Sequence, residues 1–224
     1  MLTVTTIAYG STSGYPTNVA QQRVAYDAPK AVRLRTRTFG VTMSVLPDVL
    51  APGLAVVFCG SAVGAASARR DAYYAGPGNA FWLTLADVGL TPRQLAPEEY
   101  RSIASYGLGL TDLAKTISGS DRVLSEEHFD RSGLRAKVLR YRPRILAFTS
   151  KRAGEEFIRH PVDYGLMGET IGNTVLFVLP SPSGAARRYW DKKPWCELAR
   201  VRGDAEQPVA PDPRRRASPA TAGQ

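Results

Sequence analysis

Small residues are concentrated in three short segments, each directly after an apolar run: Gly60-Ser61-Ala62-Val63-Gly64, Thr149-Ser150-Lys151 and Pro180-Ser181-Pro182-Ser183-Gly184. Small side chains let a ligand approach the backbone closely and expose its N–H groups. Pro182 fixes its own backbone and restricts Ser181 before it, so the third segment should be rigid. The three segments are therefore candidates for a ligand site, although each alone is also typical of an ordinary turn.

The composition excludes several kinds of site. Two cysteines, Cys59 and Cys196, and two histidines, His128 and His160, are too few for a disulfide framework, a cysteine-rich metal site or a histidine zinc centre. We therefore expect no metal, no cofactor and a reducing cytoplasm. No run approaches the roughly 20 apolar residues that span a bilayer. Residues 1–10 lack a secretory signal pattern, so no membrane association is expected.

The net charge of +9 is unevenly distributed along the chain. Residues 1–42 carry +4 and residues 203–224 are neutral, which leaves +5 on residues 43–202. A basic domain suits a phosphate backbone because neutralising phosphates releases counterions, although charge also serves solubility. The two ends lack apolar periodicity. We expect a disordered basic arm at 1–42 and a disordered tail at 203–224, flanking one domain.

Strand and helix patterns alternate within that domain. Continuous apolar runs at 54–59 and 145–149 predict strands buried on both faces. Other patterns predict a hairpin at 170–179, a last helix that carries Trp195, and helices at 79–88, 97–105, 133–141 and 151–159. This alternation predicts an α/β fold of three αβα layers around a mostly parallel sheet. Ligands in such folds bind beyond the carboxyl ends of the strands, where the three segments lie.

Four further features occur in a fixed order between residues 46 and 202. They are Leu50-Ala51-Pro52-Gly53-Leu54 leading to Gly60 and Gly64, Gly76-Pro77-Gly78-Asn79-Ala80-Phe81-Trp82 followed by Gly89-Leu90-Thr91, Tyr106-Gly107-Leu108-Gly109-Leu110-Thr111-Asp112-Leu113, and Leu179-Pro180-Ser181-Pro182-Ser183-Gly184. In this order and spacing they resemble the mismatch-specific uracil/thymine-DNA glycosylases of the uracil-DNA glycosylase superfamily. The resemblance does not extend to either end of the chain.

The resemblance implies a monofunctional enzyme with a uracil-DNA glycosylase-like fold. Such an enzyme hydrolyses the N-glycosidic bond of uracil, or of thymine or another deaminated base, flipped out of mismatched double-stranded DNA, and so initiates base excision repair. It needs no metal. It must place a water under C1′, stabilise the departing base anion and hold the base outside the helix. We expect a monomer in the cytoplasm, associated with the nucleoid if the source is bacterial.

The resemblance places the base pocket at Gly60, Ser61, Ala62, Tyr74 and Ser181, with Tyr74 stacked on the flipped base. Two of these positions depart from the family. The first family signature reads Gly-x-Asn-Pro-Gly, and its Asn positions the water. Ala62 stands at that Asn and cannot orient a water molecule, and Ser181 stands where the second signature begins with Asn.

An active enzyme then needs another group to hold the water. Asp112 is the first candidate, because the resemblance brings its segment, expected as a loop, to the pocket mouth. A carboxylate can accept a proton from water and stabilise a cationic sugar. Alternatively, Asp112 caps a helix that begins at Leu113. Asp71 is the second candidate, although Arg69 and Arg70 beside it favour a solvated charge cluster.

Contacts to DNA are expected after the second signature, at Ser183, Gly184, Ala185, Arg187 and Arg188. Ala185 occupies the position that the family uses for wedging and is smaller than the usual Leu. The two arginines would face phosphates, and the alternative is a solvated basic face.

Two other functions remain open. A catalytically impaired module that binds DNA or a base is consistent with Ala62. An unrelated Rossmann-like nucleotide-binding enzyme ranks last, because the segment after the first strand lacks Gly-x-Gly-x-x-Gly.

Overall fold

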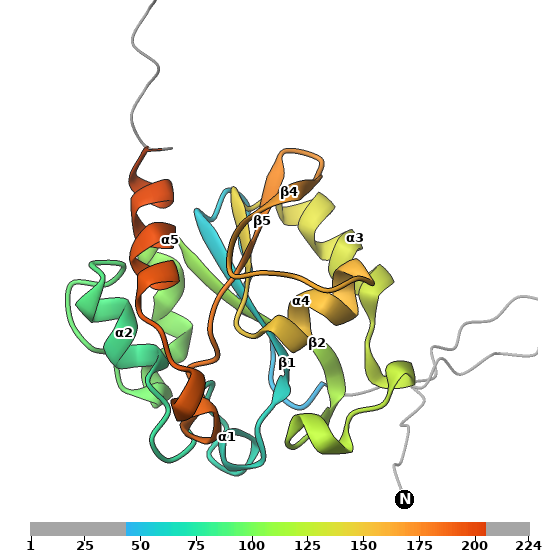
Figure 1. Ribbon diagram of the computed structural model, residues 1–224. Helices are drawn as coiled ribbons and strands as arrows, with labels where there is room; N and C mark the ends of the chain where they lie inside the picture. The colour runs from blue at the N-terminus through green and yellow to red at the C-terminus, as the bar shows by residue number, and fades with distance from the viewer. Residues whose placement is uncertain (1–43, 205–224) are drawn as a thin grey trace, which may run out of the picture. The chain divides into compact units, whose positions relative to one another are not determined.

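The computed structural model describes residues 44–204, which are coloured in Figure 1. The predicted arm at 1–42 and the predicted tail from residue 205 onward lie outside the described residues. Helix α5 (Lys193–Asp204) continues slightly beyond the predicted domain boundary. Within residues 44–204, no helix combines the length and the apolar character that crossing a membrane requires.

A five-stranded sheet forms the centre, in the order β2-β1-β3-β5-β4. Its strands are β1 (Val56–Val63), β2 (Leu108–Ser118), β3 (Ile145–Phe148), β4 (Gly165–Ile171) and β5 (Thr174–Val178). The first four strands in this order pair in parallel, and β4 pairs antiparallel with β5 through the predicted hairpin. The predicted α/β fold with a mostly parallel sheet is confirmed.

Helices α2 (Phe81–Asp87) and α5 and the 3-10 helix η1 (Pro97–Tyr106) cover one face of the sheet (Figure 1). They bury the apolar faces that the sequence predicts, with Phe81 and Trp195 both packed on Phe58 of β1. The short helices α1 (Ala65–Arg69) and η4 (Gly184–Tyr189) belong to the connections at the carboxyl ends of the strands.

Helices α3 (Arg131–Tyr141) and α4 (Lys151–Ile158) cover the other face (Figure 1). Leu134, Val138 and Ala153 pack there with Val57 and Cys59 of β1. Two short 3-10 helices, η2 (Asp121–Val123) and η3 (Glu126–His128), connect β2 to α3. Two apolar clusters on opposite faces of one sheet make the three-layer arrangement.

Two elements differ from the prediction. β2 has no predicted counterpart, because Gly109 and Thr111 interrupt its apolar pattern and its extended form depends on the ladder with β1. Leu113 lies inside this strand, so the alternative in which Asp112 caps a helix is wrong. The segment after Cys59, expected as a loop, continues β1 to Val63 while paired with β2.

The connections of β1 and β3 leave toward opposite faces of the sheet. β1 leads to α2 and η1, and β3 leads to α4. Their pairing stops at Cys59 and Phe148, after which β1 continues with β2 alone. Neighbouring parallel strands whose connections diverge in this way open a crevice at their carboxyl ends, which is where ligands bind in such folds.

Candidate active site

A cavity of about 460 Å³ opens at this crevice. It is lined by Gly60–Gly64 of β1 and the turn after it, Thr149 and Ser150 after β3, and Ser181–Ser183 after β5. The three segments of small residues therefore lie around one cavity, whose volume is in the range of small-molecule pockets.

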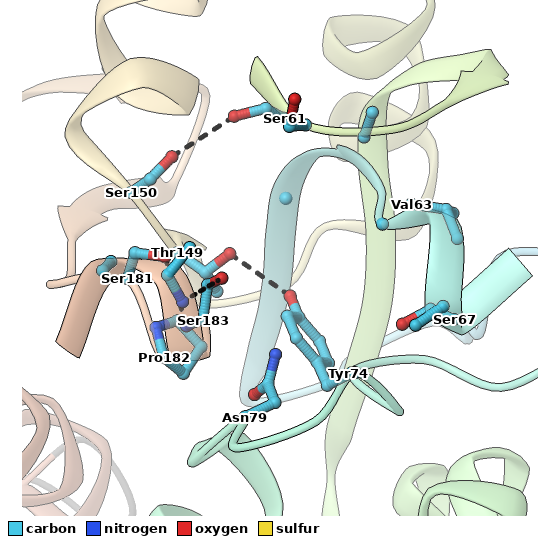
Figure 2. Close-up of a pocket in the computed structure, with 18 of the residues that line it drawn as sticks. Ser61, Val63, Ser67, Tyr74, Asn79, Thr149, Ser150, Ser181, Pro182 and Ser183 are labelled. Atoms are coloured by element: carbon cyan, nitrogen blue, oxygen red, sulfur yellow. Dashed lines mark hydrogen bonds between the residues drawn. The ribbon is translucent and has the colours of Figure 1, made fainter. Parts of the chain in front are cut away.

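Hydroxyl groups dominate the polar lining (Figure 2). Ser61 Oγ and Ser150 Oγ are 3.3 Å apart, and so are the Tyr74 hydroxyl and Thr149 Oγ1. A hydroxyl can donate or accept a hydrogen bond after a simple rotation. The lining can therefore adapt to both donors and acceptors on an uncharged ligand.

Tyr74 reaches into the cavity from the connection between α1 and α2 (Figure 2). Its ring stacks on Phe81, with centroids 3.8 Å apart and planes inclined by 14°. Its φ of +53° is unfavourable for a bulky residue and persists because the surrounding packing holds it. Burial raises the pKa of Tyr74 and keeps its hydroxyl neutral. The side chain of Asn79, next to the ring, accepts a hydrogen bond from the N–H of Phe81, the first residue of α2.

The loop after β5 is held against the loop before α2. Ala80 N–H donates to the carbonyl of Pro182 at 2.8 Å, and Ser183 N–H donates to Ser181 Oγ at 3.3 Å. Gly184 allows the two loops to touch, because a Cβ there would lie 2.6 Å from the carbonyl oxygen of Pro77. This wall of the cavity is therefore preorganised.

Asp112 supplies the carboxylate of the cavity. It is the β2 partner of Gly60, so both residues face the same side of the sheet, and its side chain is only 3% exposed. A Cβ on Gly60 would lie 2.8 Å from Asp112 Oδ1, so the missing side chain makes room for the carboxylate. Asp112 Oδ2 is buried without a hydrogen-bond partner among the described residues. Burial raises the pKa of Asp112 to about 6, against the opposing effects of Lys115 and Tyr73.

A chain of alternating charges lies behind Asp112. Lys115 Nζ is 3.6 Å from Asp112 Oδ2 and 2.7 Å from Asp48 Oδ1, and it donates to the Tyr73 hydroxyl at 3.0 Å. Lys137 Nζ is 2.7 Å from the other oxygen of Asp48. Burial alone would raise the pKa of Asp48, but the two lysines outweigh it and lower that pKa. Lys115 is thus closer to Asp48 than to Asp112. The negative charge of the Asp112 carboxylate is therefore only partly balanced by this lysine.

Asp71 lies elsewhere. It is exposed, in a turn with φ +48°, and it is not part of the cavity lining. Ala62 lines the cavity, half-buried, with its methyl group against the apolar cluster beneath α3 and α4. The carboxylate that faces the cavity is therefore Asp112.

The residues expected to contact DNA divide between the cavity and its surroundings. Ser183 and Ala185 line the cavity, whereas Arg187 and Arg188 are exposed on η4 outside it. Among the carboxylates whose side chains the structure describes, none forms an ion pair with either arginine. By contrast, Lys192 pairs with Asp87 at 3.1 Å.

Other cavity residues carry no signal in the sequence pattern. Arg122 and Tyr189 both line it, from η2 and η4 respectively. Arg122 lies far along the chain from all the signature segments, so only the fold brings it to this opening, whereas Tyr189 directly follows the predicted DNA contact Arg188. In the part of the chain that the structure describes, no three His, Cys, Asp or Glu side chains are grouped as a metal site.

Comparison with known proteins identifies the fold and the family. Residues 47–202 match the family described as the Uracil DNA glycosylase superfamily. The solution NMR structure of a provisionally assigned uracil DNA glycosylase from Methanosarcina acetivorans is 26% identical, with a TM-score of 0.52, over 74% of this chain and 99% of that one. Members of this superfamily are DNA glycosylases. The match spans the sheet, both helical layers and the cavity, and the chain therefore belongs to the Uracil DNA glycosylase superfamily.

Proposed function

We propose that the protein is a DNA glycosylase that hydrolyses the N-glycosidic bond of uracil, or another deaminated base, flipped out of mismatched double-stranded DNA. The observation that carries this proposal is the buried carboxylate of Asp112 on a cavity lined by hydroxyl groups. Removal of the base from DNA by this route would initiate base excision repair.

The geometry supports a separate role for each group that lines the cavity. The base would stack on Tyr74 and bond to the hydroxyls around it. Asp112 would accept a proton from the water that adds to C1′, while its charge stabilises the cationic sugar. The C1′–N bond breaks as the water oxygen bonds to C1′, and the electron pair leaves with the base. Hydroxyl and backbone N–H groups would stabilise that anion before it takes up a proton.

Excision of uracil opposite guanine is expected without added metal. Purified protein would be incubated with a labelled duplex in EDTA, and abasic sites would be revealed by alkaline cleavage. Parallel duplexes carrying thymine, hypoxanthine or xanthine would define the substrate range. Activity that EDTA abolishes would contradict the proposed mechanism.

A non-catalytic binding module is the second candidate, and Ala62 is the observation that favours it. The same duplexes distinguish the two functions. Retention of uracil-containing DNA with no abasic product at stoichiometric protein would support the module.

Binding to duplex DNA is expected to weaken steeply with salt, partly through Arg187. Each lost phosphate contact lowers the slope of log K against log salt by about 0.9 for duplex DNA. Arg187→Ala should therefore reduce the slope measured by fluorescence anisotropy by about this amount. Arg135→Ala is a matched control, because Arg135 is exposed on α3, in the opposite layer. Equal slopes for Arg187→Ala and the parental protein would remove Arg187 from the DNA footprint.

A further inference from the structure

The mouth of the cavity carries one large exposed aromatic side chain. Tyr189, in η4, is 71% exposed and also lines the cavity. The other large apolar side chains exposed within residues 44–204 do not line it, and all are more covered than Tyr189. An aromatic ring in solvent at the rim of a ligand site is a candidate contact for a partner.

Tyr189 is held on an anchored support. Ser183 Oγ accepts a hydrogen bond from Ala185 N–H at the start of η4. At its end, Trp190 packs on the buried Trp195, with ring centroids 5.9 Å apart. The exposed ring therefore lies on a short helix whose two ends are both held by contacts to neighbouring residues.

The positive charges beside this ring favour binding of a polyanion. Arg187 and Arg188 precede Tyr189 on the same short helix, and both are exposed without an ion-pair partner in the described residues. Arg122 lines the cavity from η2, on a different segment of the chain. An aromatic ring beside unpaired arginines is the combination that binds bases and phosphates together.

When one nucleotide is flipped out of a duplex, it leaves a gap between its neighbouring base pairs. A side chain that occupies this gap stabilises the flipped state. Proteins that unstack base steps do so with inserted apolar side chains. Ala185 carries only a methyl group and cannot fill the space of a base. Tyr189, also on η4, carries a ring of suitable size and shape.

We propose that Tyr189 is the side chain that enters the duplex and stacks in the place of the extruded base. The inference rests on the proposed function, since it requires a DNA duplex as the ligand of the cavity. It assigns to η4 the step that separates double-stranded from single-stranded substrate, because an unpaired strand has no stack to fill.

The test compares uracil in a duplex with uracil in a single strand of the same sequence, under single-turnover conditions. Tyr189→Ala is expected to slow excision from the duplex by roughly 10- to 100-fold, the worth of one aromatic–base stack, and to leave the single-strand rate unchanged. Tyr189→Phe should retain the parental duplex rate, because it keeps the ring. Tyr164→Ala is the control, since this tyrosine is 40% exposed and outside the cavity lining.

A second measurement follows base flipping without chemistry. A 2-aminopurine beside the target base should brighten when the parental protein binds the duplex, and this rise should be lost in Tyr189→Ala. The inference would be overturned if Tyr189→Ala lost excision rate equally on duplex and single-stranded substrate, or lost none on either. An unchanged fluorescence rise in Tyr189→Ala would also overturn it. If the parental protein excises nothing, the proposed function fails, and the fluorescence alone then decides the role of Tyr189. If the parental protein acts only on duplexes, the fluorescence measurement likewise decides the role of Tyr189.

Discussion

Asp112→Ala and Asp112→Asn are expected to slow single-turnover excision of uracil by about 10²- to 10⁴-fold, the usual contribution of a positioned general base. Ala62 cannot orient water, and Asp112 is the carboxylate that lines the cavity. DNA binding should survive, because removing a carboxylate from a basic cleft does not weaken contacts to phosphate. Excision would be measured at saturating enzyme, with binding measured separately by anisotropy.

Asp71→Asn is the matched control for these variants. Asp71 is exposed outside the cavity, and Asn tolerates its positive φ. This variant should retain the parental rate, and all three proteins should melt cooperatively. Parental excision by Asp112→Ala would remove Asp112 from the mechanism.

The pH profile tests the same assignment independently. Burial raises the pKa of Asp112 to about 6, and the reaction uses the ionised form. Excision should therefore fall as the pH drops through about 6, which is well above the ordinary range of an aspartate. Lys115 lowers this pKa, so Lys115→Met should move the acidic limb to higher pH. A limb that stays in place in Lys115→Met would contradict the assignment.

Gly60→Ala is expected to slow excision by about 10²-fold or more. The added Cβ would lie 2.8 Å from Asp112 Oδ1 and 3.8 Å from Thr149 Oγ1, so the carboxylate must move away. A displacement of about 1 Å at a reacting group can cost about 100-fold in rate. The measurement is again single-turnover excision, with DNA binding as the reference.

A double variant shows whether Gly60 acts through Asp112. In the Asp112→Ala background the carboxylate is absent, so Gly60→Ala should add little further loss. Gly168→Ala controls for the loss of a glycine, because a Cβ there meets no atom within 4 Å. Losses that multiply in the double variant would show that Gly60 acts in another way.

The sequence alone determined the features that depend on local patterns. The apolar runs of β1 and β3 mark strands buried on both faces, and the spacing of Phe81 and Leu85 marks a helix face, because burial requires these periods. The order of strands and helices then predicts the three layers. Small residues after the strands also indicate where a ligand could approach the backbone.

Only the tertiary structure decided how Asp112 is placed. Its segment looks like a loop locally and becomes a strand only through the ladder with β1. Its pKa is raised by burial and by the charge of Asp48, a residue far away in the sequence, against the opposing effect of Lys115, which lies between the two carboxylates. Tyr189 is likewise an unremarked surface residue until η4 brings it to the cavity. Local patterns record periodic burial, whereas desolvation and charge pairing depend on which distant segments meet, and no local pattern records that.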